Sequence, residues 1–136
     1  MPGTIPAARQ HLIDDIAKLA RKVRGAPLPL PAFVQAYYRG VGEEALQARD
    51  PAAFAASAAE ALSFGTVRPA GEPRVRVFNP QLQRDGWESP HTIVEVVTED
   101  MPFLVDSLAV VLGDSRLPIQ LMIHPVLRIA RDRRGK

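Results

Sequence analysis

Three acidic side chains lie close together between two apolar stretches of the sequence. Glu99, Asp100 and Asp106 fall within eight positions of one another. Paired carboxylates act as general acid and base when burial or mutual repulsion separates their pKa values. Such a site requires that the side chains converge, so the elements that carry them decide whether this chemistry is possible.

The predicted elements point these carboxylates in different directions. Glu99 follows the strand expected at residues 91–98, and the helical periodicity of residues 102–112 places Asp106 opposite the apolar side of that helix. Asp100 lies where a side-chain oxygen caps the free N–H groups of a helix start, and a helix start lowers a carboxylate pKa. We therefore expect capping and surface roles, with an acid–base pair as the alternative.

The start of this helix is itself a candidate binding site. Its unpaired backbone N–H groups can receive a carboxylate or a phosphate. We therefore expect possible effector binding at Asp100, Met101, Phe103 and Leu104.

The sequence "GVGEEA", residues 40–45, matches the glycine fingerprint of dinucleotide-binding proteins. It follows a predicted helix instead of a strand, and Glu43 and Glu44 would place negative charge where a pyrophosphate must lie. We expect no cofactor site here.

The histidines offer no metal or nucleophile site. His11, His91 and His124 share no short metal-ligand spacing. Ser89 and His91 have no neighbour that would orient the imidazole. We expect neither a catalytic residue nor a metal ligand in this chain.

The first half of the chain has helical periodicity. Apolar residues recur at helical spacing from Leu12 to Val23 and again in residues 31–40. Asp50 is the expected N-cap of a third helix, with Pro51 at its first position. We expect residues 1–70 to form an N-terminal helical segment that serves as a packing platform.

From residue 73 onward the apolar period changes to that of strands. Residues 74–78 and 91–98 predict two strands, residues 102–112 a helix, and residues 119–129 a long third strand. The order strand, strand, helix, strand indicates an α+β fold, in which residues 91–129 form one right-handed βαβ crossover. We expect residues 71–136 to be a partial α+β domain, cut off at its C-terminus.

The composition limits the functional classes. The chain has 136 residues, 46% of them hydrophobic, a formal net charge of +2 and no cysteine. No disulfide framework or thiol nucleophile is possible. No apolar run approaches the roughly 20 residues of a membrane-spanning helix, and the N-terminus lacks a secretory pattern. We expect a cytoplasmic protein.

Several stretches carry a resemblance to a known family. They are "FVQAYYRG" and "LQARDPAAF" in the first half, and "GEPRVRVF", "EDMPFLVDS" and "IHPVLRIARD" in the second. Together they resemble the N-terminal region of the large bacterial NAD-dependent glutamate dehydrogenases. The resemblance covers roughly residues 30–134 and implies an ACT-like regulatory domain on a ferredoxin-like plan, in which Phe103 stands near a turn where ACT domains usually carry glycine.

The resemblance implies a non-catalytic piece of an enzyme. The parent would oxidise L-glutamate to 2-oxoglutarate and ammonium with NAD, while this chain would hold no cofactor and serve regulation or assembly. Its expected partners are the remainder of the enzyme, further subunits of a homo-oligomer and an amino-acid effector. We also expect an uncovered sheet to be covered by dimerisation.

Two alternatives stay open. The first is a stand-alone ACT-like sensor of a small ligand. The second is an RNA-binding ferredoxin-like module, with Arg74, Arg76 and the basic tail as its contacts. The second lacks the sheet-face aromatic residues on which bases stack, since only Phe78 lies on a predicted strand.

Overall fold

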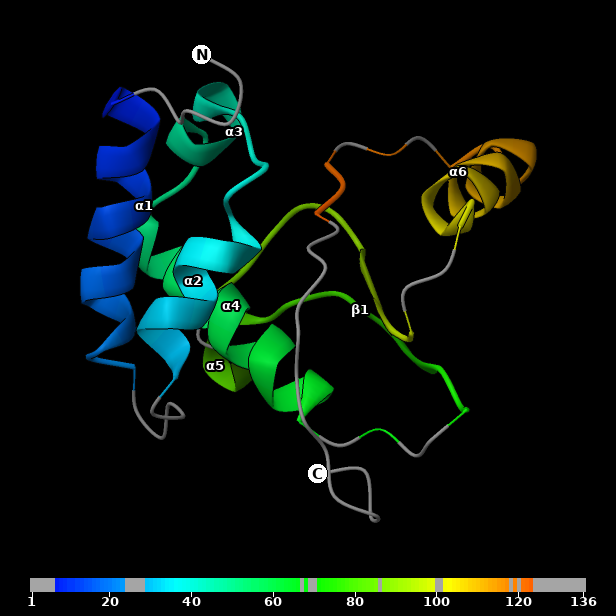
Figure 1. The fold of residues 1–136 in the computed structure, drawn as a ribbon, viewed down its shortest axis with the longest axis horizontal. Helices are drawn as coiled ribbons and strands as arrows, with labels where there is room; N and C mark the ends of the chain where they lie inside the picture. The colour runs from blue at the N-terminus through cyan, green and yellow to red at the C-terminus, as the bar shows by residue number, and fades with distance from the viewer. Residues whose placement is uncertain are drawn as a thin grey trace.

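The computed structural model describes residues 7–23, 29–66, 68, 71–85, 87–99, 102–117, 119 and 121–123. Helices α1–α4 form one group, and helix α6 lies at the opposite end of the molecule, with the strands between them (Figure 1). The predicted α+β class is therefore confirmed.

The described residues of the first part of the chain contain four helices. They are α1 (Ala7–Ala20), α2 (Leu30–Tyr37), α3 (Glu43–Gln47) and α4 (Pro51–Gly65). The N-cap prediction at α4 is confirmed, because the Asp50 side chain accepts a hydrogen bond from the N–H of Ala52 and Pro51 is the first helical residue. Helix α1 begins at Ala7, five residues before the apolar spacing that starts at Leu12, so Asp14 lies in its interior.

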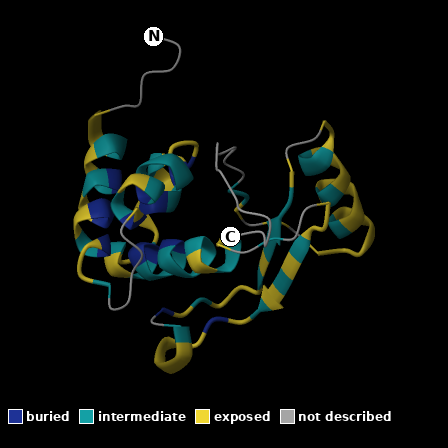
Figure 2. Ribbon diagram, turned by 60° about the horizontal axis from the view of Figure 1, so that its bottom comes forward, coloured by how far each residue is buried: buried dark blue, intermediate teal, exposed yellow. Residues whose placement is uncertain are grey.

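The buried core belongs to this helical group, where buried residues are concentrated (Figure 2). Ile13 and Ile16 of α1 pack with Val34 of α2 and with the small residues of α4. Tyr38 is fully buried, and its hydroxyl donates a 2.7 Å hydrogen bond to the carbonyl of Phe54. A buried hydroxyl must find such a partner to offset its lost hydration.

A polar network ties α1 to α2 beside this core. The Asp14 carboxylate accepts hydrogen bonds of 2.8 Å from the side-chain amides of both Gln10 and Gln35. These two bonds lower the pKa of Asp14, because they favour its ionised form.

The second part of the chain contains an antiparallel pair of strands. Strands β1 (Arg74–Phe78) and β2 (Ile93–Val97) pair with Val75 opposite Val96 and Val77 opposite Val94. Their connection contains the short helix α5 (Leu82–Asp85) and Trp87. Trp87 is 5% exposed and its ring meets Phe78 edge to face, so it anchors this connection against β1.

The third strand, predicted at residues 119–129, is absent from the residues of that stretch that the structure describes. Residues 119 and 121–123 are not in a strand, and residues 124–129 lie outside the described part of the chain. Ile123 instead packs against the helical core, which removes it from the regular alternation that the sequence predicted. The described sheet therefore has two strands, and the βαβ crossover stays a prediction.

Helix α6 (Leu104–Asp114) confirms the helix predicted at residues 102–112, shifted by two residues. None of its residues is buried, and Val110 and Val111 of its sequence are largely exposed. None of the helices in the described part of the chain has the length and apolar character needed to cross a bilayer.

Candidate functional site

The carboxylates of Glu99 and Asp106 do not form an acid–base pair in the described structure. Glu99 follows β2, and its carboxylate lies 3.7 Å from the guanidinium of Arg68. Asp106 is exposed in the first turn of α6, as predicted. Asp100 lies outside the described residues, so its predicted position is untested.

The predicted effector site is placed only in part. Asp100 and Met101 lie outside the described residues, whereas Phe103 and Leu104 are described. Helix α6 begins at Leu104, so Phe103 takes the N-cap position that the sequence assigned to Asp100. The helix starts two residues later than its apolar period indicated, and the role of Asp100 stays a prediction.

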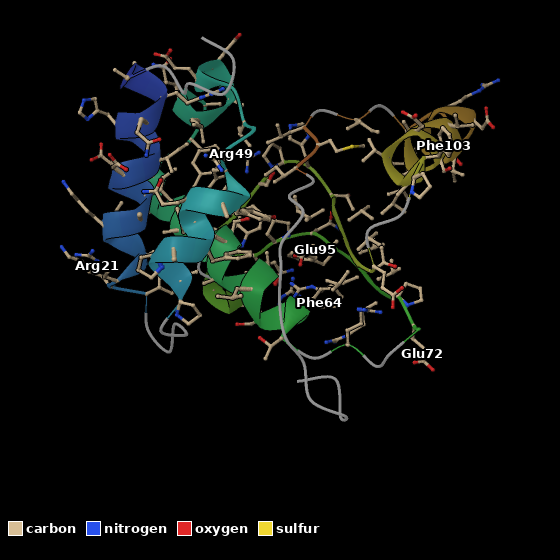
Figure 3. The ribbon with its side chains drawn as sticks, in the orientation of Figure 1. Arg21, Arg49, Phe64, Glu72, Glu95 and Phe103 are labelled. Atoms are coloured by element: carbon tan, nitrogen blue, oxygen red, sulfur yellow. The ribbon has the colours of Figure 1, made fainter. Side chains whose placement is uncertain are left out.

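Phe103 has an unusual backbone conformation at this helix start. Its φ is 65° and its ψ is 8°, which is the left-handed region that glycine adopts without strain. Its side chain is 76% exposed and makes no capping hydrogen bond. The ring is therefore exposed to solvent, and Figure 3 shows Phe103 beside α6, apart from Glu95 of β2 and Phe64 of α4.

The arginines of β1 are directed toward the helices. Arg74 donates a 2.8 Å hydrogen bond to the carbonyl of Phe64 and lies over the ring of that residue. Arg76 donates a 3.0 Å hydrogen bond to the carboxylate of Glu60. Both side chains are thus engaged with α4, which weakens the case for an RNA-binding surface built on them.

The opposite face of the strands is apolar and largely exposed. Val75 and Val77 are 60% and 63% exposed, and their cross-strand neighbours are Val96 and Val94. We call these four residues the valine face. The alternation of β1 predicted that its valines share a face, but it could not show that the arginines, and not the valines, meet the helices.

The structure brings together a charged cluster that the sequence analysis missed. It contains Glu60 of α4, Arg76 of β1 and Asp85 of α5, and the Arg76 guanidinium lies 3.0 Å from the Glu60 carboxylate and 3.9 Å from the Asp85 carboxylate. No short motif could have shown it, because its members come from three separate elements.

The remaining candidates have structural contacts. The Ser89 hydroxyl receives hydrogen bonds from the guanidinium of Arg49 and from the N–H of His91. Gly42 of the "GVGEEA" stretch is the N-cap of α3, and Glu43 and Glu44 fill the first turn of that helix. Within the described ranges no group of acidic and histidine residues has the arrangement of a metal site.

Comparison with known proteins places these features in a family. The model of the family described as "Glutamate dehydrogenase, ACT1 domain" matches residues 33–136. The NAD-specific glutamate dehydrogenase of Halomonas elongata is 45% identical over 60 residues, which is 44% of this chain and 4% of that protein. The enzyme of the same name from Pseudomonas aeruginosa is 42% identical over 65 residues, 48% of this chain and 4% of that protein.

No solved structure matches the chain. The aligned segment makes up only a small share of either relative, so the similarity concerns one domain and not the length of those proteins. The family match, in contrast, covers most of the chain, including the strands and α6. This chain belongs to the glutamate dehydrogenase ACT1 domain family.

Proposed function

We propose that this chain is a non-catalytic regulatory and assembly domain of a large NAD-dependent glutamate dehydrogenase. The parent enzyme would convert L-glutamate, NAD and water to 2-oxoglutarate, ammonium and NADH in the cytoplasm. NAD would bind elsewhere in the parent. The family match and the names of both relatives support this proposal.

The domain would divide into a helical segment, residues 1–70, and a partial ACT-like unit, residues 71–136. The concentration of buried residues in α1–α4 supports this division. The remainder of the parent enzyme and further copies of the chain would be its partners.

The valine face is the observation that carries the assembly role. Val75, Val77 and Val94 present adjoining β-branched side chains to solvent, whereas the other face of β1 meets α4. A contiguous exposed apolar patch on a sheet favours association. The proposed occupant is the same face of a second copy, because two such faces are alike in shape and uncharged, and a homo-oligomer results from their pairing.

Light scattering of the 136-residue chain over a range of concentrations tests this role. We expect a dimer that the double substitution Val75→Thr, Val77→Thr shifts toward monomer, because threonine keeps the β-branched shape and adds a hydroxyl that must be desolvated. Val110→Thr on α6 is the matched control, since Val110 is 62% exposed but lies off this face. A monomeric wild type at high concentration contradicts the assembly role.

The start of α6 is the proposed effector site, with Asp100, Met101, Phe103 and Leu104 as its residues. The exposed N-terminal end of α6 supports binding of a carboxylate. Isothermal calorimetry with L-glutamate and other L-amino acids tests this, with Asp100→Ala as the comparison. If no L-amino acid binds, the regulatory role is lost and the assembly role stands alone.

A stand-alone sensor is the competing function. The reading frame of the source gene distinguishes the two, because a parent dehydrogenase requires a long continuous frame that encodes a glycine-rich strand-to-helix fingerprint. A short frame without that fingerprint contradicts the proposed parent enzyme.

A further inference from the structure

The contact between α4 and the β1–β2 connection is built from charged side chains. The Arg76 guanidinium lies 3.0 Å from the carboxylate of Glu60 and 3.9 Å from that of Asp85. The side chains of Glu60 and Asp85 are 18% and 5% exposed, so two well-covered carboxyl groups lie beside the same guanidinium. Two carboxyl groups this close and this well covered repel each other unless one of them holds a proton.

Asp85 is the partner that stays ionised. Its carboxylate accepts hydrogen bonds from the N–H of Gln81 at 2.7 Å and from the guanidinium of Arg84 at 3.0 Å. The bond from Arg84, followed by that from Glu60, holds the pKa of Asp85 well below its usual range. Charge-assisted hydrogen bonds of this kind favour the carboxylate form.

Glu60 is therefore the partner that carries the proton. Burial, together with the adjacent Asp85, raises the pKa of Glu60 to about 7, and Arg76 opposes this shift. The buried indole N–H of Trp87 also lowers the pKa of Glu60, although its geometry falls short of a standard hydrogen bond. At neutral pH, Glu60 thus lies near the midpoint of its titration.

Further charged or titratable groups face this pair from neighbouring elements. Glu95 on β2 lies opposite Arg76 in the strand register, and burial, more than the nearby charge of Asp85, raises its pKa. Tyr37 of α2 faces Glu95, and burial raises the pKa of Tyr37 to about 12, so Tyr37 stays neutral throughout the range in which Glu60 titrates.

We propose that a proton shared between Glu60 and Asp85 fastens the β1–β2 connection to α4, and that this joint loosens when Glu60 ionises. With the proton in place, the Glu60 hydroxyl donates to the Asp85 carboxylate. Without it, two negative charges face each other, and Arg76 and Arg84 must balance both. The joint depends on residues outside the proposed effector site, so it goes beyond the function proposed above.

The direction of the pH dependence follows from the two shifts. The pKa of Glu60 is raised from 4.5 to about 7 on folding, so its stabilising effect is full below 4.5 and is lost as the pH rises through about 7. The pKa of Asp85 is lowered from 3.8, so its effect is present above that value and is lost only in stronger acid. The joint is therefore tightest in mild acid and loosest above neutrality.

Hydrogen exchange of the 136-residue chain between pH 5.5 and 8 tests this joint. After correction for the intrinsic pH dependence of exchange, we expect protection of the β1–β2 connection to fall about thirtyfold relative to α1, because roughly 1.5 pH units separate pH 5.5 from the Glu60 pKa of about 7 and each unit is a factor of ten. Glu60→Gln should remove this dependence, because its side-chain amide donates to Asp85 at every pH. Amide protection of the β1–β2 connection in the Glu60→Gln variant at pH 8 should then match that of the wild type at pH 5.5.

Two matched variants make the result specific. Glu88→Gln changes an exposed glutamate of the same connection. Glu95→Gln removes the other carboxyl group whose pKa is raised by burial. Both should keep most of the wild-type pH dependence. Protection of the wild type that does not change with pH, or a Glu60→Gln variant that responds as the wild type does, overturns the proposal.

A second measurement covers the case in which Glu60→Gln fails to fold. Carboxyl carbon chemical shifts of the wild type report the titration of Glu60 directly. A midpoint above about 6 supports the shared proton, and a midpoint near the ordinary value of 4.5 overturns it.

Discussion

The guanidinium of Arg76 on β1 meets the carboxylate of Glu60 on α4 at 3.0 Å, and this pair joins the strands to the helices. Arg74 makes a parallel contact with the carbonyl of Phe64 at the end of α4. The strands thus rest on α4 largely through arginine side chains, whose aliphatic stems can cover apolar surface while their charged ends are paired.

The first prediction concerns this pair. A double-mutant cycle of Arg76→Ala and Glu60→Gln at pH 8 should give a coupling energy of about 1 kcal/mol, because the pair is partly shielded from water. The coupling should shrink at pH 5.5, where Glu60 carries a proton. Urea denaturation measures both values. Arg21→Ala, at an exposed arginine after α1 (Figure 3), should change stability by less than about 0.5 kcal/mol.

The second prediction concerns the buried hydroxyl of the helical core. Tyr38→Phe should lower the free energy of unfolding by about 1–2 kcal/mol, because it leaves the carbonyl of Phe54 without its 2.7 Å donor. Tyr37→Phe removes a hydroxyl from the adjacent, less buried ring and should cost less. Equal losses in the two variants contradict a special role for the Tyr38 bond.

The third prediction concerns the left-handed residue before α6. Phe103→Val should cost about 1–2 kcal/mol, since a β-branched side chain tolerates a φ of 65° poorly. Phe103→Gly should change stability by less than about 0.5 kcal/mol, because relief of the strain offsets the greater freedom of the unfolded chain. Hydrogen exchange of α6 measures both changes.

Ala109→Gly is the control for this third prediction. Ala109 is exposed in the middle of α6, where glycine brings no relief of strain, so this variant should lose about 1 kcal/mol. If Phe103→Gly costs as much as Ala109→Gly, the left-handed conformation of Phe103 is not strained.

The fourth prediction concerns Asp14 and acid. Hydrogen bonds from Gln35 and Gln10 lower its pKa from 3.8, so their stabilising effect is present above 3.8 and is lost as the pH falls below it. Gln35→Ala should therefore reduce stability at pH 7 and narrow the stability difference between pH 7 and pH 3. Gln47→Ala, which loses an exposed bond to Glu43, should leave that difference unchanged.

The helical half could be predicted well because its signals are local. The Asp50 cap and Pro51 lie next to the helix that they begin, and the apolar spacing from Leu12 onward identifies the side of α1 that is buried. Helix α3 was missed, because five residues are too few to show a helical period.

The strands were placed correctly, whereas their surroundings were not predictable. Alternation in β1 separates Arg74 and Arg76 from Val75 and Val77, but it does not say which set faces the helices. The partner that decides this is Glu60 on α4, sixteen positions before Arg76 along the chain. The cluster of Glu60 and Asp85 was missed for the same reason.

The predicted third strand shows the limit of periodicity. Residues 119–129 alternate regularly, yet Ile123 packs on the helical core and residues 119 and 121–123 are not in a strand. Alternation predicts a strand only if a neighbouring strand is available for pairing, and the sequence of one segment does not contain that information.

The uneven placement of the buried residues has a thermodynamic consequence. Nearly all of them belong to α1–α4 and the turns between, while β1, β2 and α6 contribute none. Cooperative melting requires that distant parts share one packed interior. Heating this chain should therefore release the strand pair and α6 before the helices, in separate steps instead of one sharp transition.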